Sequence, residues 1–175
     1  MGKFNVFRHS VSVALVLGFL MGAAQAQAEP YAPVYSVPDG IESAALYRQQ
    51  AQRISEMVPS RDEVEVPPYP GAVVFLVHPE EEVRQMIGTG GFAEIKLLTA
   101  DSEDQIIAFY TENLVDWHFH EDFSIFWYGQ PEFDLGRLMQ GKPHITIQPA
   151  GSIVRGQVPD AEHMISIVYR SPVPE

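Results

Sequence analysis

The fold is decided by residues 102–128, SEDQIIAFYTENLVDWHFHEDFSIFWY, where a helix pattern runs directly into a strand pattern. Ser102, followed three residues later by Gln105, is a capping-box sequence that marks the first turn of a helix. Apolar side chains then recur at three- and four-residue spacing, as on the buried face of a helix. They are Ile106, Phe109, Tyr110 and Leu114. The stretch therefore predicts a helix over 102–115 that packs one face on a sheet.

The second half of the stretch, residues 117–128, alternates as a single β-strand whose successive side chains point to opposite faces. The aromatic face, which is the natural core face, carries Trp117, Phe119, Glu121, Phe123, Ile125 and Trp127. The other face carries His118, His120, Asp122, Ser124, Phe126 and Tyr128. Glu121 does not fit an apolar face, so we expect either a β-bulge near Glu121 and Asp122 or a strand that begins later.

His118, His120 and Asp122 on the second face form the candidate metal site of the chain. Alternate histidines on a strand direct two imidazoles into one region, a geometry that zinc and copper sites use, and Asp122 adds a carboxylate as the third ligand. Three more histidines, each expected at a strand end, are candidates for completing the site. They are His78, His144 and His163. The alternative is an exposed strand face with titratable side chains and no ligand.

A catalytic role for the same residues is a remote alternative, in which His118 beside Asp122 acts as the general base of a hydrolase. No nucleophile motif accompanies the pair, because Gly151-Ser152 lacks the Gly-x-Ser-x-Gly pattern of a nucleophile elbow. Gly88-Thr-Gly-Gly91 also lacks the lysine and the spacing of a phosphate-binding loop. We therefore expect no catalytic residue, and no cofactor apart from the copper or zinc ion of the candidate site.

The chain around this stretch predicts an α+β fold, with an antiparallel sheet of four or five strands and the 102–115 helix packed on one face. The other expected strands are short apolar or alternating runs bounded by turn residues. They are 72–77, 94–99, 145–147 and 165–169. Short helical segments are expected between Pro79 and Gly88 and between Pro131 and Met139.

An export signal is predicted in residues 1–28. Lys3 and Arg8 supply a positive start, an apolar run follows, and small residues alternate before a cleavage site after Ala28, with Ala26 as the second choice. The apolar run is too short for a membrane span, and the chain has no cysteine to carry a lipid anchor. We therefore expect a periplasmic or secreted protein.

Two further segments are expected after the signal. Residues 29–65 are predicted to form a proline-rich arm and a separate amphipathic helix, whose thin apolar stripe lies within residues 41–58. That stripe is suited to packing on the outside of the domain or on a partner protein. Residues 66–175 are predicted to form the α+β domain itself.

Net charge limits the classes of binding partner, and the absence of cysteine limits the chemistry of the chain. The formal net charge is −12, and without residues 1–28, which hold two basic residues and no acid, nine basic against 23 acidic residues leave −14. Such a surface repels nucleic acid and anionic lipid headgroups. The absence of cysteine excludes disulfides, a thiol nucleophile and thiolate metal ligands.

One set of motifs resembles a known group of proteins. Pro68-Tyr-Pro-Gly-Ala72 enters a strand, and a helix start, an aromatic pair, a leucine and a tryptophan follow. The matching residues are Thr99, Ser102, Asp104, Phe109, Tyr110, Leu114 and Trp117. Across residues 66–128 the chain resembles small bacterial secreted and lipid-anchored domains of unknown function, departing from them at Asp116, which replaces a glycine, and in an insertion from Pro79 to Gly91. The resemblance implies one main helix on an antiparallel sheet and no catalytic residue.

These observations predict an exported, non-catalytic interaction or accessory module. A protein partner is expected to contact residues 41–58, and Phe126 with Tyr128 would add an apolar patch on the second strand face. The alternative is a periplasmic protein that binds copper or zinc through the histidine-rich strand. Nucleic-acid binding and a membrane span are not expected.

Overall fold

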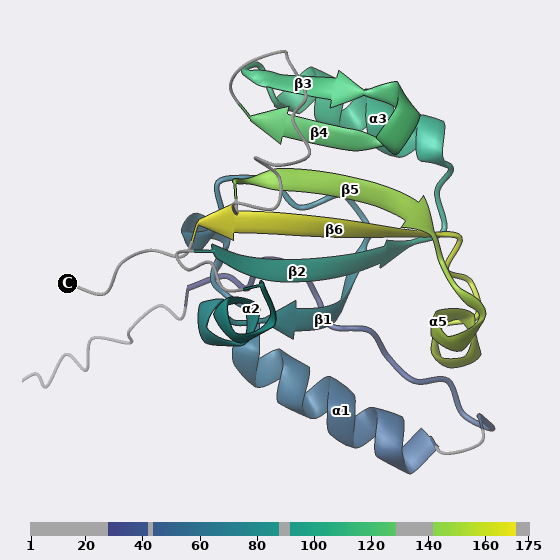
Figure 1. The fold of residues 1–175 in the computed structure, drawn as a ribbon. Coiled ribbons are helices and arrows are strands. Elements are labelled where there is room, and N and C mark those ends of the chain that lie inside the picture. The colour runs from purple at the N-terminus through teal and green to yellow at the C-terminus, as the bar shows by residue number, and fades with distance from the viewer. Residues whose placement is uncertain (1–27, 42–43, 88–91, 129–141, 171–175) are drawn as a thin grey trace, which may run out of the picture.

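The computed structural model describes residues 28–41, 44–87, 92–128 and 142–170, which form a sheet with helices around it (Figure 1). The strands are β1 Val73–His78, β2 Phe92–Thr99, β3 Trp117–His120, β4 Ile125–Tyr128, β5 His144–Pro149 and β6 His163–Arg170. The helices are α1 Ala44–Met57, α2 Glu80–Ile87, α3 Glu103–Asn113 and α5 Ser152–Gln157, and 3-10 turns lie at Arg61–Glu63 and Glu121–Phe123. None of these described helices is long and apolar enough to cross a membrane.

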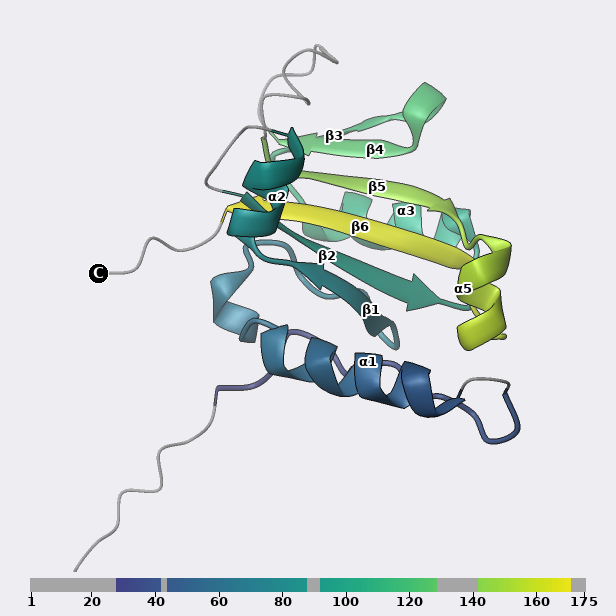
Figure 2. The ribbon, with the colours of Figure 1, turned by 60° about the horizontal axis from the view of Figure 1, so that its bottom comes forward.

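The six strands form one antiparallel sheet in the order β1–β2–β6–β5–β4–β3. Because β3 to β6 are neighbours in chain order, the connection from β2 to β3 must cross the sheet. It contains α3, which lies behind the sheet in Figure 1 and Figure 2, whereas α2 lies in front of it. The predicted α+β class is confirmed, with six strands instead of four or five and with one helix, α5, that was not expected. The helical segment predicted over 131–139 lies outside the described residues.

The helix α3 begins where its sequence predicts. The Ser102 hydroxyl accepts a hydrogen bond from the Gln105 backbone N–H at 3.4 Å, and the Gln105 side-chain oxygen accepts one from the Ser102 backbone N–H at 3.0 Å. This reciprocal pair is the predicted capping box, which satisfies two backbone donors that a helix start leaves open.

The core-facing side of α3 is centred on Ile106 and Tyr110, both with no exposed surface, and continues to Leu114. Phe109, expected in the same stripe, is only partly buried. Its ring meets the edge of the Tyr69 ring at a centroid distance of 5.2 Å. The helix is therefore rotated slightly from the face that spacing alone suggests.

The predicted single strand over 117–128 is instead a hairpin. Glu121–Phe123 form a 3-10 turn and Ser124 adopts a left-handed conformation with φ of 47°, so that β4 turns back on β3. A straight strand would have pressed Glu121 against the core, at a high desolvation cost, whereas the turn leaves its carboxylate in solvent. The Ser124 hydroxyl donates to the Glu103 carboxylate and so ties the turn to the start of α3.

The hairpin changes which side chains share a face. Trp117 lies opposite Tyr128 and Phe119 lies opposite Phe126, with ring centroids 5.7 Å and 4.8 Å apart. Phe126 and Tyr128 therefore share the face of Trp117 and Phe119. The prediction that they lie beside the histidines is wrong, because side-chain alternation does not continue through the turn.

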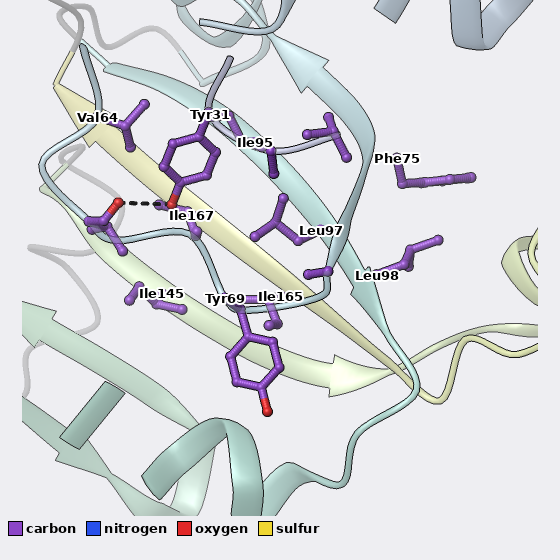
Figure 3. Close-up of a cluster of buried hydrophobic side chains, with 14 of the residues drawn as sticks. Tyr31, Val64, Tyr69, Phe75, Ile95, Leu97, Leu98, Ile145, Ile165 and Ile167 are labelled. Carbon is purple, nitrogen blue, oxygen red and sulfur yellow. Dashed lines mark hydrogen bonds between the residues drawn. The ribbon is translucent and has the colours of Figure 1, made fainter. Parts of the chain in front are cut away.

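The hydrophobic core lies on the α3 side of the sheet. Ile95, Ile167 and Ile145 are opposite one another on β2, β6 and β5, and none has exposed surface. Figure 3 shows the rings of Tyr31 and Tyr69 lying over these strands. The N-terminal arm and the entry to β1 thus close the core where α3 does not reach.

The arm before α1 is part of this core. Tyr31 is 2 % exposed, and its hydroxyl donates to the Val66 carbonyl at 2.9 Å. The Tyr35 N–H donates to the Val74 carbonyl at 3.1 Å, and the Val74 N–H donates to the Pro33 carbonyl at 2.7 Å. The arm therefore adds a short parallel bridge to the outer edge of β1.

The helix α1 lies beside β1 (Figure 2), and residues of its predicted apolar stripe pack on the core. Ile54 is 1 % exposed, and Ala51 and Val58 pack beside it against the core. Leu46 and Met57 are exposed on the other side of the helix. The expectation of a separate helix needs correction, because α1 and the strands share one hydrophobic core.

Candidate functional site

The strand β3 places His118 and His120 on one face, as alternation predicts. Their partners across the hairpin are Trp127 and Ile125. Asp122 does not lie on the strand, because it sits in the 3-10 turn with an exposed side chain. The structure thus gives the two predicted imidazole ligands a common face and moves the predicted carboxylate off it.

The three other candidate histidines do not complete a metal site. His144 is opposite Trp127, and Trp127 is opposite His118, so the buried indole occupies the row between the two histidines. His78 lies on the far strand β1, and His163 lies at the other end of the sheet. Across the described ranges, no three His, Asp or Glu side chains are grouped in a way that could hold a metal ion.

Titration with copper tests whether His118 and His120 bind a metal ion without Asp122. We expect Asp122→Ala to leave the heat of copper binding unchanged, because Asp122 lies in the turn. Any specific binding should require His118 and His120 together and should favour copper over zinc. Isothermal titration of residues 29–175 and of the His118→Ala/His120→Ala variant measures this. Equal heats from these two proteins would contradict a metal site on β3.

A polar network on the same sheet face surrounds Glu94, in β2. The Ser166 hydroxyl donates to the Glu94 carboxylate, the Lys96 ammonium lies 3.5 Å from it, and His78 Nε2 lies 3.9 Å from it. The Glu94 side chain is 18 % exposed. A carboxylate this well shielded needs such partners, because burying a charge without them is costly.

The network also connects α2 to the sheet. His78, the last residue of β1, places its Nδ1 3.1 Å from the Glu82 carboxylate in the first turns of α2, while its Nε2 faces Glu94. One imidazole therefore lies between a helix carboxylate and a strand carboxylate. Because Glu94 is already engaged by a hydroxyl and an ammonium, we assign the network a structural role.

Sequence reasoning missed this network, although a signal was present. Glu94 and Lys96 alternate with buried Ala93 and Ile95, and Ser166 interrupts an apolar run in β6. Such alternation indicates a strand with one apolar and one polar face. The sequence does not show that the polar positions meet, because Glu94 and Ser166 are 72 residues apart.

His144 makes the stability of the fold dependent on pH. Burial lowers its pKa below the ordinary 6.5, against the opposing effects of the Lys142 carbonyl and the charge on Glu94. Below about pH 6.5 the unfolded chain then binds the proton more readily than the folded protein, so stability falls as the pH drops. We expect His144→Gln to lose part of this fall when urea unfolding is compared at about pH 7.5 and 5.5. An equal fall in the free energy of unfolding in the wild type and in His144→Gln would contradict this role of His144.

A groove of about 530 Å³ separates the arm from the entry to β1. It is lined by Glu29–Pro33, Arg61 and Pro68–Ala72. The hydroxyls of its two tyrosines are already engaged, since Tyr31 donates to a backbone carbonyl and Tyr69 donates to Asp101 at 2.7 Å. The groove is therefore mainly a proline and backbone surface with one guanidinium group.

Exposed apolar side chains gather around the hairpin. Of the seven large apolar side chains exposed in the described part of the chain, three lie on the hairpin or next to it. Val115 is 92 % exposed, Phe123 53 % and Tyr128 50 %. Together with the partly buried Trp117, which packs on Tyr128, we call these residues the hairpin surface.

The hairpin surface is bordered by negative charge. Residues 102–128 contain six acidic residues and neither lysine nor arginine. Asp116, Glu121 and Asp122 are exposed beside the apolar side chains. The exposed apolar side chains of the hairpin surface therefore lie within an acidic border.

Comparison of the chain with protein-family models, with curated proteins and with solved structures finds no match. The hairpin surface and the histidine face are therefore judged by their own geometry.

Proposed function

We propose that this chain is an exported, non-catalytic interaction module that binds an extended, basic segment of a partner protein at the hairpin surface. The observation that supports the proposal is the exposure of Val115 and Tyr128 at the open end of the hairpin and of Phe123 in its turn, all along the edge of the sheet where β3 is the last strand. A concentration of large exposed apolar side chains on one edge element is typical of protein interaction sites.

The outer edge of β3 offers main-chain hydrogen bonds to such a segment. The Trp117 N–H donates to the Leu114 carbonyl at 3.2 Å and so does not pair with β4. The alternation of an antiparallel ladder then directs the N–H and C=O of Phe119 away from β4. A partner segment added as a further strand would bond there, and its alternate side chains would reach the hairpin surface.

Charge supports a basic segment as the occupant. Lysine or arginine side chains in the added strand would lie near Asp116, Glu121 and Asp122. Complementary charge of this kind speeds association and fixes the register of the partner more than it raises affinity. Binding should therefore weaken as salt is added.

Export is the second part of the proposal, and it rests on the signal pattern of residues 1–28. Partner contact through residues 41–58 has less support, because the apolar stripe of α1 packs on the core. The exposed side chains Leu46 and Met57 leave a smaller docking area there.

Affinity capture from periplasmic extract compares the hairpin surface with the exposed side chains of α1. We expect residues 29–175 to retain a partner at low salt, and Phe123→Ala/Tyr128→Ala to lose most of it. The matched variant Leu46→Ala/Met57→Ala on α1 should retain it. The peptide that the module protects in the retained protein should be extended and rich in lysine or arginine. Equal recovery by the wild type and the hairpin variant would refute the proposed surface.

Transition-metal binding is the second candidate function. It is favoured by the common face of His118 and His120 on β3, and the copper titration tests it separately. The hydrolase alternative has less support, because Asp122 lies in the turn rather than on the strand beside His118.

A further inference from the structure

The arm is fixed from its first residues onward. The Arg61 N–H donates to the Glu29 carbonyl at 2.9 Å, and the Tyr31 N–H donates to the Pro59 carbonyl at 2.9 Å. These two bonds pair the arm with the segment after α1 as a short antiparallel bridge. The backbone is thus held one residue after the predicted end of the export signal.

Tyr31 anchors this bridge in the core. Its side chain is 2 % exposed, and Figure 3 shows the ring over the sheet near Ile95 and Ile167, with its hydroxyl bonded to a backbone carbonyl. Releasing the arm would expose the ring and break the hydrogen bond to Val66. Opening of the arm must break these buried contacts, so we expect the open state to be a minor one.

We propose that the bond between Ala28 and Glu29, which lies between exposed residues, is a processing site that the docked arm makes resistant to cleavage by holding the adjacent backbone. This inference rests on the proposed export of the chain. Hydrolysis adds one water across the peptide bond, leaving a carboxylate on Ala28 and an ammonium on Glu29. A peptidase must hold the residues on both sides of that bond in its own cleft, whereas the docked arm holds the Glu29 carbonyl and buries Tyr31. The export signal is therefore removed before the arm docks.

The same geometry distinguishes the two predicted cleavage sites. A cut after Ala28 leaves a mature chain that starts at the residue whose carbonyl is bound by Arg61. Ala28 and Glu29 line a hollow together with Arg61 and Asp62 in the uncut chain, so the new ammonium would lie beside these two charged residues. A cut after Ala26 would leave two residues ahead of that contact. We therefore assign Glu29 as the mature N-terminus.

Cleavage of the full chain, residues 1–175, by signal peptidase in detergent micelles tests the order of events. The chain is either folded beforehand or diluted from urea directly into the peptidase. Intact-mass measurement identifies a product that begins at Glu29. We expect the folded chain to be cut at least about tenfold more slowly, because cleavage must wait for the arm to open. Tyr31→Ala should restore rapid cleavage of the folded chain.

Two further variants separate release of the arm from loss of stability. Ile147→Ala truncates a buried side chain on β5 and should leave the folded chain resistant. Tyr31→Phe removes only the hydroxyl and should speed cleavage less than Tyr31→Ala. If the folded wild type is cut as fast as Tyr31→Ala, or if Ile147→Ala is cut equally fast, protection by the arm is refuted and export is not. If the chain diluted from urea is left uncut, the export signal itself is refuted.

Discussion

Replacing Tyr110 with alanine should lower the free energy of unfolding by about 3–5 kcal/mol, the usual cost of truncating a buried aromatic side chain. Tyr110 has no exposed surface, and its ring centroid lies 5.8 Å from that of Phe126 and 5.1 Å from that of Phe109. The ring thus joins α3 to the hairpin, and its removal would leave a cavity between them. Phe109→Ala should cost less, because Phe109 is only partly buried.

The Tyr110→Phe variant is the matched control and should have the opposite effect. The Tyr110 hydroxyl is buried and has no hydrogen-bond partner in the described part of the structure, and burial raises its pKa well above the ordinary value. Removing an unsatisfied hydroxyl should raise the free energy of unfolding by about 1 kcal/mol. Urea unfolding of the three proteins measures both effects. A clear loss of stability in Tyr110→Phe would show that the hydroxyl is bonded in solution.

Residues 66–175 alone should show no cooperative unfolding transition. Tyr31, Tyr35 and Ile54 lie in the same buried cluster as the sheet, and a chain that begins at residue 66 lacks all three. Because one buried aromatic is worth about 3–5 kcal/mol and a whole domain is stable by about 5–15 kcal/mol, their combined loss should leave no stable fold.

Thermal unfolding followed by circular dichroism compares residues 66–175 with residues 29–175. The longer chain should give one sharp transition, and the shorter chain a gradual slope without one. Adding residues 29–65 as a separate peptide should recover part of the transition, if the loss comes from missing core contacts. A sharp transition in 66–175 alone would support the predicted boundary before Val66 as a true domain boundary.

The elements that the sequence predicts well are those with local causes. Ser102 and Gln105 cap α3 through side chains only three residues apart, and the strand runs 94–99 and 165–169 show their apolar periodicity directly. Such signals depend on near neighbours in the chain, so tertiary packing does not override them.

The elements that the sequence predicts poorly depend on contacts between residues that are far apart in the chain. Ser124 turns the hairpin with a positive φ, although it is neither glycine nor asparagine, and its contact with Glu103 is 21 residues away. The short helix α5, Ser152–Gln157, contains Gly156 and has too few residues for a clear period. Prolines indicate an arm over residues 29–40, but burial of Tyr31 appears only when the sheet is assembled.

The residues of the candidate site show the same contrast between features with local causes and features that depend on distant contacts. The shared face of His118 and His120 follows from alternation within one unbroken strand, and the structure has it. Asp122 belongs to that face only if the strand continues, and the turn interrupts it. Tyr128 was predicted in an apolar patch with Phe126, but Phe126 is buried, and Tyr128 instead meets Trp117 through the antiparallel register.

The pairing of the arm with β1 covers part of one edge of the sheet and leaves the β3 edge open in the described part of the chain. Head-to-tail polymers of sheets grow when the free edge of one copy joins the opposite free edge of the next. Here the bridge between Val34 and Val74 covers the beginning of the β1 edge, so within the described ranges β3 is the more accessible edge for a second copy. Edge-to-edge association would then end at a symmetric pair of β3 strands, and the acidic residues around the hairpin oppose even that. We therefore expect loss of the arm to make the folded protein more prone to fibre-like aggregation.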